Sequence, residues 1–533
     1  MTRMNELRSR GNVRRNRGHV AIVLHAHLPY VRRSGDDERM EEQWLYEALW
    51  ECYLPLLEVI ERASERRADP CVTVSLSPTL LSMLGDPHHR RGFDAFAATL
   101  GETCSRAERH PRFGQAAAEH RYRLERSTAR WLAASRDLPR AFVELGNAGR
   151  VELMTTAATH AFLPTLLLPG AVRAQLRLGR RYFSTVTGRT ADGLWLPECG
   201  YDERLGSDIA RAGVRYAILE EHGLDLARPR PLGVPFRPIV SPEGVAYFGR
   251  AADLVGLVWS SARGYPGHPA YREFHGDLSQ LAPELVAPGW IGPTGIRPLA
   301  VTGGTGDKET YAPELAQKLA LSHASDFVQH IDGALGASDC ADPIAVLAFD
   351  AELFGHWWWE GPTFLAELLS LLGDRAISLS TYLDRDPEIV VAEPATSSWG
   401  EGGFAGVWTN PSAAHAIRTG HRAERRVHYV DTLVRDTPRT PVQREARLWA
   451  IRELMQLEAS DYPFLLSLGE STDFAERRLF EHATNVDRLT RIASRQTPAH
   501  GDEEIVRAVR ERRPLFAELD EDALADALDP FED

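Results

Sequence analysis

Seven short apolar runs, separated by stretches with helical periodicity, constrain the fold of this chain more than any other feature. Near-continuous apolar strands that alternate with helices are typical of a parallel sheet with both faces buried. The number of runs favours a barrel related to the (β/α)8 type over an open sheet. The runs lie at residues 20–27, 71–78, 151–160, 193–200, 216–223, 344–355 and 388–395.

In two regions the sequence predicts helices without intervening strands. Residues 84–148 are rich in Ala, Arg and Glu and hold no good strand, which predicts a helical insertion. Later in the chain, apolar residues recur at three- and four-residue intervals, which predicts a helical C-terminal domain. A chain of 533 residues exceeds the roughly 250–300 over which one core grows, so several domains are expected. The expected parts are a disordered basic tail (1–17), a barrel (18–83 and 149–408), the insertion (84–148), the C-terminal domain (409–500) and an acidic tail (501–533).

Composition narrows the class of partner and the compartment. A net charge of −14 argues against nucleic acid and against an anionic membrane surface, since both favour a basic protein face. No segment approaches about 18 uninterrupted apolar residues, so no membrane span is expected. The five cysteines are scattered without a CxxC pair, which fits a reducing compartment and predicts a cytoplasmic protein.

Residues 224–276 form a long irregular segment with five prolines near its start. Long stretches without secondary structure in a compact domain are usually functional. We therefore predict that this segment is a lid over the functional site.

Ionisable side chains gather where the predicted strands end. In barrels of this class the active site lies at the carboxyl ends of the strands, so these groups are expected to meet at one mouth. A single buried histidine is more often a hydrogen-bonded structural residue, but that explanation is poor for the whole set. The set comprises His25, His27, His160, Glu198, His222 and Asp350.

Two of these residues suit paired-carboxylate chemistry. Glu198 follows a strand and a proline in LWLPECGYD, and Asp350 ends a strand in AFDAELFGHWWWEG. Glycosidases use two carboxyl groups, one that attacks and one that donates and then recovers a proton. The tryptophans at 357–359 would desolvate the acid and raise its pKa, as the proton donor requires, and aromatic rings suit the faces of sugars.

Other aromatic residues occur in Gly- and Ser-rich settings, which favour exposed platforms for some of them. Taken singly, each is more often a packing residue than a contact residue, because aromatics dominate ordinary cores. They are Trp44, Trp259, Tyr265, Trp399 and Trp408.

At these residues the chain resembles glycoside hydrolase family 57 and, within it, the 1,4-α-glucan branching enzymes. The resemblance covers about residues 18 to 490, and its third and fourth motifs together are highly specific. The similar motifs, in chain order, are HAHLPYVR with EEQWLYEA, GRVELMTTAATHAFLP, LWLPECGYD, FDAELFGHWWWEG, SSWGEGGFAGVW and ELMQLEASDYPF.

The resemblance implies an α/β fold with an incomplete (β/α)7 barrel, a helical insertion and an α-helical C-terminal domain. It implies a retaining enzyme with Glu198 as nucleophile and Asp350 as general acid/base, which cleaves α-1,4-glucan and transfers the chain to a 6-hydroxyl. No cofactor and no catalytic metal are implied. The implied substrate-binding residues are His25, His27, Trp44, His160, Arg250, Trp259, Trp399, Trp408 and Asp461.

Two departures from the family pattern leave the split between transfer and hydrolysis open. Arg250 is followed by Ala251 where the family usually has Asp, and the preceding loop carries Phe236 and no Tyr. A 4-α-glucanotransferase or α-amylase of the same fold is therefore an alternative.

Two alternatives come from other classes. One is a zinc-dependent amidohydrolase that would use His25, His27, His222 and Asp350 as metal ligands. The other is a glucan-binding protein without catalytic activity. The sequence does not indicate an oligomeric state.

Overall fold

The computed structural model describes residues 18–33, 39–260, 263–302 and 307–530. The predicted basic tail (1–17) lies outside the described residues. Within the described part, no helix combines the length and the apolar character that a membrane crossing requires.

Among the described residues, seven parallel strands close into a barrel in the order β1-β2-β3-β4-β5-β7-β8, with β8 paired back to β1. The strands are short and nearly all of their residues are buried, as expected when helices cover a parallel sheet. The predicted barrel class is confirmed. The strands are β1 (His19–Ala26), β2 (Val72–Leu76), β3 (Glu152–Thr156), β4 (Gly193–Trp195), β5 (Tyr216–Glu220), β7 (Ala246–Arg250) and β8 (Ile344–Asp350).

One of the seven predicted strands was wrong. The run at 388–395 contributes only β9 (Val390–Val391), which pairs with β6 (Ile239–Val240) outside the barrel. The seventh barrel strand is β7, which lies inside the segment predicted to be an irregular lid. Its sequence, AYFGR, is short and follows a proline-rich stretch, so its apolar pattern is weak. Its pairing with β5, β8 and the short β6 makes it a strand.

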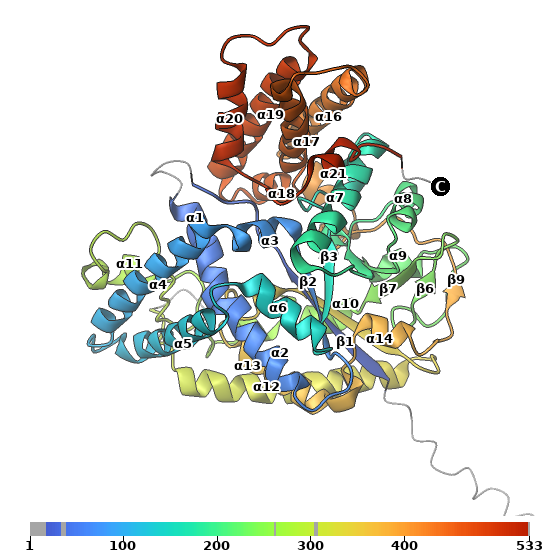
Figure 1. Cartoon of the computed structure of the whole chain (residues 1–533). Coiled ribbons are helices and arrows are strands. Elements are labelled where there is room, and N and C mark those ends of the chain that lie inside the picture. Colours follow the sequence, from blue (N-terminus) through green and yellow to red (C-terminus); the bar gives the residue numbers. More distant parts are fainter. Residues whose placement is uncertain (1–17, 34–38, 261–262, 303–306, 531–533) are drawn as a thin grey trace, which may run out of the picture.

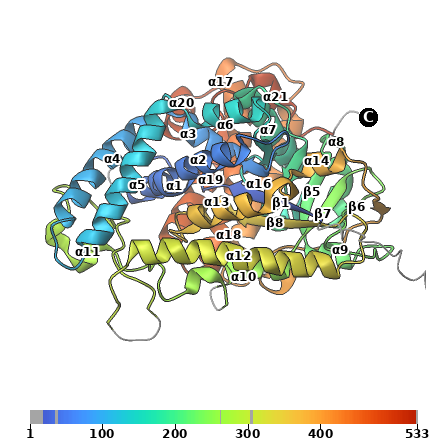
Figure 2. The ribbon, with the colours of Figure 1, turned by 90° about the horizontal axis from the view of Figure 1, so that it is seen from below.

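Helices surround the barrel and extend beyond it. The insertion region contains α4 and α5, which lie side by side at one end of the molecule (Figures 1 and 2). Helices α16, α17 and α19 pack together as a layer above the barrel (Figure 1). The helices are α1 (Arg39–Ala48), α2 (Leu54–Ser64), α3 (Pro78–Gly85), α4 (Pro87–Ala107), α5 (Gly114–Ala133), α6 (Leu138–Asn147), α7 (Pro169–Thr187), α8 (Gly206–Arg211), α9 (Glu221–Asp225), α10 (Ala252–Trp259), α11 (Leu278–Leu281), α12 (Pro313–Ala337), α13 (Gly361–Leu372), α14 (Leu379–Leu383), α15 (Gly406–Thr409), α16 (Ala414–Val434), α17 (Pro441–Leu457), α18 (Asp461–Leu468), α19 (Thr472–Ser494), α20 (Asp502–Arg512) and α21 (Glu521–Ala525).

The predicted acidic tail (501–533) is packed against the rest of the protein as far as it is described. Helices α20 and α21 lie within it, and Leu515 and Phe516 between them are fully buried. The Phe516 ring contacts the Tyr182 ring of α7, with centroids 4.6 Å apart. Most acidic residues of this segment face solvent. Most of its few apolar residues are buried and attach the segment to the rest of the protein.

Helices α1 and α2 are joined by a π-helical turn (Leu49–Tyr53) that directs side chains toward the loop after β8. Such turns rotate the following residues and often occur at functional sites. The Tyr53 hydroxyl donates a hydrogen bond to Glu352, and the Cys52 thiol donates to the Ala351 carbonyl at 2.9 Å. This turn therefore supports the loop that begins at Asp350.

The same loop approaches the π-helical turn so closely that Gly355 has no room for a side chain. Its φ is +120°, and a Cβ there would lie 1.8 Å from the Glu51 carbonyl oxygen. Gly355→Ala should cost about 3 kcal/mol or more, from left-handed strain and overpacking together. Gly188→Ala is the matched control, because its φ is +67° in open space and its cost should be only about 1–2 kcal/mol. Thermal unfolding measures both variants, and equal midpoints would contradict the expected close packing.

Candidate functional site

Strand register brings the predicted site residues to one level of the barrel. His25 of β1 is paired with Ser75 of β2 on one side and with Asp350 of β8 on the other. Glu220 of β5 is paired with Arg250 of β7. Because all the barrel strands are parallel, these carboxyl ends face the same mouth.

Glu198 lies three residues beyond β4 in a strained turn. Its φ and ψ are 62° and 21°, a left-handed conformation that non-glycine residues rarely adopt. The Trp399 indole N–H donates to Oε2 at 2.7 Å, and the Ser460 hydroxyl donates to Oε1 at 2.9 Å. Both oxygens of a carboxylate that is only 12% exposed are thus held in place.

A chain of hydrogen bonds leads to this carboxylate from Ser75 of β2. Ser75 Oγ lies 3.0 Å from His25 Nδ1, His25 Nε2 lies 2.9 Å from His160 Nε2, and His160 Nδ1 lies 2.8 Å from Ser460 Oγ. Burial holds the pKa of both histidines well below the ordinary value, so both rings are neutral. Since Ser460 donates its proton to Glu198, His160 must donate from Nδ1 and accept at Nε2. His25 then donates from Nε2 and accepts from Ser75, and this order assigns both tautomers.

His27 is stacked on His160 with ring centroids 4.0 Å apart. Its Nδ1 lies 2.9 Å from Ser77 Oγ, and its Nε2 lies 3.3 Å from the carboxylate of Asp461, the first residue of α18. His25, His27 and His160 therefore each have protein partners at both ring nitrogens. These contacts hold the three rings beside the predicted catalytic acids, and their contact with sugar hydroxyls stays a prediction.

The two predicted catalytic acids, Asp350 and Glu198, have different electrostatic surroundings. Burial raises the pKa of Asp350 well above its ordinary value, and the nearby Glu352 and Glu198 raise it further against the opposing Arg250. Burial raises the pKa of Glu198 to about 6, and the bonds from Trp399 and Ser460 limit the rise. The raised pKa suits Asp350 to the predicted role of proton donor, and the two hydrogen bonds that stabilise ionised Glu198 suit it to the predicted role of nucleophile.

Glu352 is buried beside Asp350, and burial raises its pKa to about 7. It accepts hydrogen bonds from the Tyr53 hydroxyl and, at 3.2 Å, from the His27 backbone N–H.

The Arg250 side chain contacts three neighbouring groups of the protein. Its guanidinium donates to Glu220 and, at 3.2 Å, to the Ala348 carbonyl. It also lies over the Trp399 ring, 5.3 Å from the centroid. Arg250 therefore fixes the indole that holds Glu198.

The predicted aromatic residues divide into exposed and buried groups. Trp259 and Trp357 are 45% and 40% exposed, and their rings meet edge to face at 5.6 Å, which forms a platform. Trp408 is 1% exposed and stacked on Phe162 at 4.4 Å, so its ring is packed in the interior in this structure. Trp44 is half-buried and packs edge to face on Phe474 of α19 at 5.2 Å.

Sequence reasoning missed Ser460 and Glu352. Ser460 precedes Asp461, and Glu352 lies two residues after Asp350. Neither a serine nor a second acid beside a predicted site residue indicates a function by its sequence position alone. Ser460 reaches Glu198 across 262 positions of the chain, so only the packed structure reveals it.

The zinc-hydrolase alternative requires its four ligands to converge. Among the described residues, two groups bring three potential ligand atoms within 4.8 Å of one another, and neither contains His25, His27, His222 or Asp350. His222 instead donates from Nε2 to the Gly403 carbonyl at 2.7 Å. The structure does not assemble the proposed zinc ligands.

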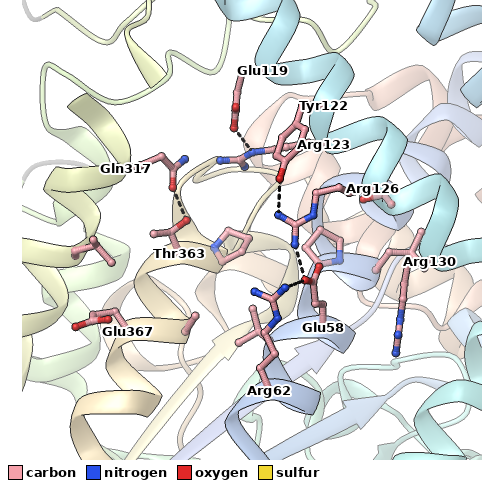
Figure 3. Close-up of a pocket in the computed structure, with 17 residues that line it drawn as sticks. Glu58, Arg62, Glu119, Tyr122, Arg123, Arg126, Arg130, Gln317, Thr363 and Glu367 are labelled. Atoms are coloured by element: carbon pink, nitrogen blue, oxygen red, sulfur yellow. Dashed lines mark hydrogen bonds and ion pairs between the residues drawn. The ribbon is translucent and has the colours of Figure 1, made fainter. Parts of the chain in front are cut away.

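A separate hollow of about 520 Å³ lies among α2, α5, α12 and α13 (Figure 3). Its charged side chains are bonded to one another: Glu58 pairs with Arg62 and Arg126, and Arg123 pairs with Glu119 at 2.7 Å. Its lining includes none of the predicted site residues.

Comparison with known proteins agrees with this geometry. The model of glycosyl hydrolase family 57 matches residues 21–385, and the model described as 1,4-alpha-glucan branching enzyme, C-terminal, matches residues 420–523. The chain is 29% identical over 507 residues to the 1,4-alpha-glucan branching enzyme TK1436 of Thermococcus kodakarensis, which covers 89% of this chain and 73% of that relative.

Two solved structures show the same architecture. The GH57-type branching enzyme of Pyrococcus horikoshii has a TM-score of 0.84 and 28% identity, over 95% of this chain and 97% of the other. The alpha-amylase AmyC of Thermotoga maritima has a TM-score of 0.82 and 29% identity, over 95% of this chain and 99% of the other. Because the family model covers more than half of the chain, the chain belongs to glycosyl hydrolase family 57.

Proposed function

We propose that this protein is a retaining 1,4-α-glucan branching enzyme with Glu198 as nucleophile and Asp350 as general acid/base. The observation that carries the proposal is the pairing of a carboxylate held by two donors with a neighbouring acid whose pKa is strongly raised. Retaining glycosidases need this division between an ionised nucleophile and a protonated donor.

In the first half-reaction, Glu198 attacks the anomeric carbon of an α-1,4 linkage while Asp350 gives its proton to the leaving oxygen. The products are a β-linked glycosyl-enzyme ester and a shortened chain with a free 4-hydroxyl. In the second half-reaction, Asp350 takes the proton of an acceptor 6-hydroxyl, and that oxygen displaces Glu198. The configuration is retained and an α-1,6 branch forms.

Transfer rather than hydrolysis requires that the acceptor chain compete with water. Holding the acceptor raises its effective concentration at the ester. The Trp259 and Trp357 platform offers exposed aromatic faces for glucose rings, and Asp461 offers a carboxylate 14% exposed beside His27.

The amylase alternative has a specific observation behind it, because one similar structure is titled an alpha-amylase. The match of residues 420–523 to the branching-enzyme C-terminal model favours branching. A binding protein without activity would not need a strained turn and two donors to hold Glu198.

The expected partner is a neutral α-glucan, for which the net charge of −14 is no obstacle. All five cysteines are free thiols, and four of them are buried. These features support our placement of the reaction in the reducing cytoplasm.

The wild-type protein should convert amylose into branched glucan. Short chains should be released only after an α-1,6-specific debranching enzyme is added, and chain-length profiling before and after debranching measures this. Oligosaccharides released before debranching, without new α-1,6 linkages, would identify an amylase instead.

The roles of the two acids can be separated by rescue with azide. Glu198→Ala and Asp350→Ala should each lose activity on amylose by on the order of 10³-fold or more. With α-maltosyl fluoride, whose leaving group needs no proton, azide should restore turnover to both variants. Glu198→Ala should give the β-glycosyl azide, because azide replaces the nucleophile, and Asp350→Ala should give the α-anomer. The reverse assignment of products by NMR would exchange the two roles.

Ser460→Ala tests the hydrogen bond to the nucleophile. Loss of a donor to the carboxylate should raise the pKa of Glu198 above about 6. Because activity requires the ionised form, the acid limb of the kcat/KM–pH profile should move to higher pH, by about one unit. Ser460→Thr should restore the profile. Ser397→Ala is the control, because it removes a buried hydroxyl that has no hydrogen-bond partner among the described residues. An unchanged acid limb in Ser460→Ala would contradict the role of this bond.

A further inference from the structure

Three side chains with metal-ligand chemistry converge away from the barrel mouth, between α1 and α4. Glu42 lies in α1, and His88 and His89 lie in the first turn of α4. One ligand atom from each falls within 4.8 Å of the others. Glu42 is 4% exposed and His89 is 2% exposed, so the group is interior rather than a surface accumulation of charge.

The Glu42 carboxylate is oriented by neighbouring groups. The Arg33 backbone N–H donates to Oε1 at 2.8 Å, and the Tyr46 hydroxyl donates to Oε2 at 3.4 Å. Tyr46 can reach this position because Gly92 of α4 has no side chain: a Cβ there would lie 1.9 Å from the Tyr46 hydroxyl oxygen. Hydrogen bonds that orient a ligating carboxylate are typical of protein metal sites.

His89 provides the observation that distinguishes this cluster from an ion pair. Within the described residues, neither of its ring nitrogens has a hydrogen-bond partner, although buried polar groups almost always find one. In its neutral form an imidazole carries an N–H on one nitrogen and a lone pair on the other, and that lone pair can bind a metal ion.

His88 is already directed at the same carboxylate, with Nε2 2.6 Å from Glu42 Oε1. A structural ion pair between these two residues would explain that contact but would leave the unpartnered His89 ring unexplained. Glu42 and His88 also line a hollow of about 370 Å³, together with Trp290 and Phe96. A fourth ligand such as water can enter from this side.

We propose that Glu42, His88 and His89 bind a divalent zinc-class ion. Two imidazoles and one carboxylate are a ligand set that Zn²⁺ takes in tetrahedral sites, with one position left for water. The bound ion would join α1 to α4 and thereby hold the segment after β1. Because α1 continues into the turn that supports the loop after Asp350, the ion would stabilise the fold beside the barrel mouth without entering the reaction.

The test is zinc binding by the full chain, purified without a histidine tag and stripped with chelator. Wild type should take up one equivalent of Zn²⁺ by elemental analysis and calorimetry, and its thermal unfolding midpoint should rise. Cobalt(II) should give the visible absorption of a four-coordinate site. His88→Gln and His89→Gln should weaken binding by on the order of 100-fold or more. His330→Gln, which removes a surface histidine 3.6 Å from Asp326, should bind as wild type does.

His88→Gln protects the test against misfolding, because His88 is only partly buried whereas His89 is in the core. Absence of stoichiometric zinc in wild type would overturn the proposal. Equal affinity in wild type and the folded His88→Gln variant would also overturn it. Zinc lost only in His356→Gln would place the ion at the other cluster, Glu47, Glu51 and His356, and would equally contradict the assignment.

Discussion

The surroundings of the Glu198 carboxylate depend on almost every part of this architecture, because the group is almost fully removed from water and its proposed role requires it to ionise. Burial alone would keep it protonated, since an uncompensated buried charge costs several kcal/mol. Two hydrogen bonds compensate, one from the Trp399 indole and one from the Ser460 hydroxyl. The two donors come from different parts of the chain, one from the loop that follows the barrel strands and one from the helical C-terminal region. The hydrogen bonds to this carboxylate thus require that both parts of the chain be folded together.

The histidines gain a clear physical role from this arrangement. His25 and His160 are neutral, stacked and bonded in a fixed order that ends on Ser460. The Glu198 carboxylate at the end of this chain sets the direction of every hydrogen bond in it, because an ionised carboxylate can only accept hydrogen bonds. The chain of bonds therefore fixes the orientation of these side chains from Ser75 of β2 to Glu198.

The loop after β8 is supported in a comparable way from the other side. The π-helical turn between α1 and α2 supplies Tyr53 to Glu352, and the tight contact at Gly355 keeps the loop against this turn. Glu352 in turn raises the pKa of Asp350. Glu42 of the proposed zinc site lies on α1, which leads directly into this π-helical turn, so the proposed site is connected through helix with the surroundings of Asp350.

The sequence by itself determined the barrel class and the candidate acids, because both are local signals. Apolar runs have a period that a short window reveals, and an acid directly after a strand points to the barrel mouth whatever the rest of the chain does. Only the tertiary structure decided which weak run is the seventh strand, since β7 owes its strand conformation to pairing with β5, β6 and β8. It also decided that Trp408 is packed, that the acidic C-terminal segment is held in place, and that Ser460 meets Glu198. Burial and hydrogen bonding between residues hundreds of positions apart leave no periodic trace in the chain, so no local pattern could have shown them.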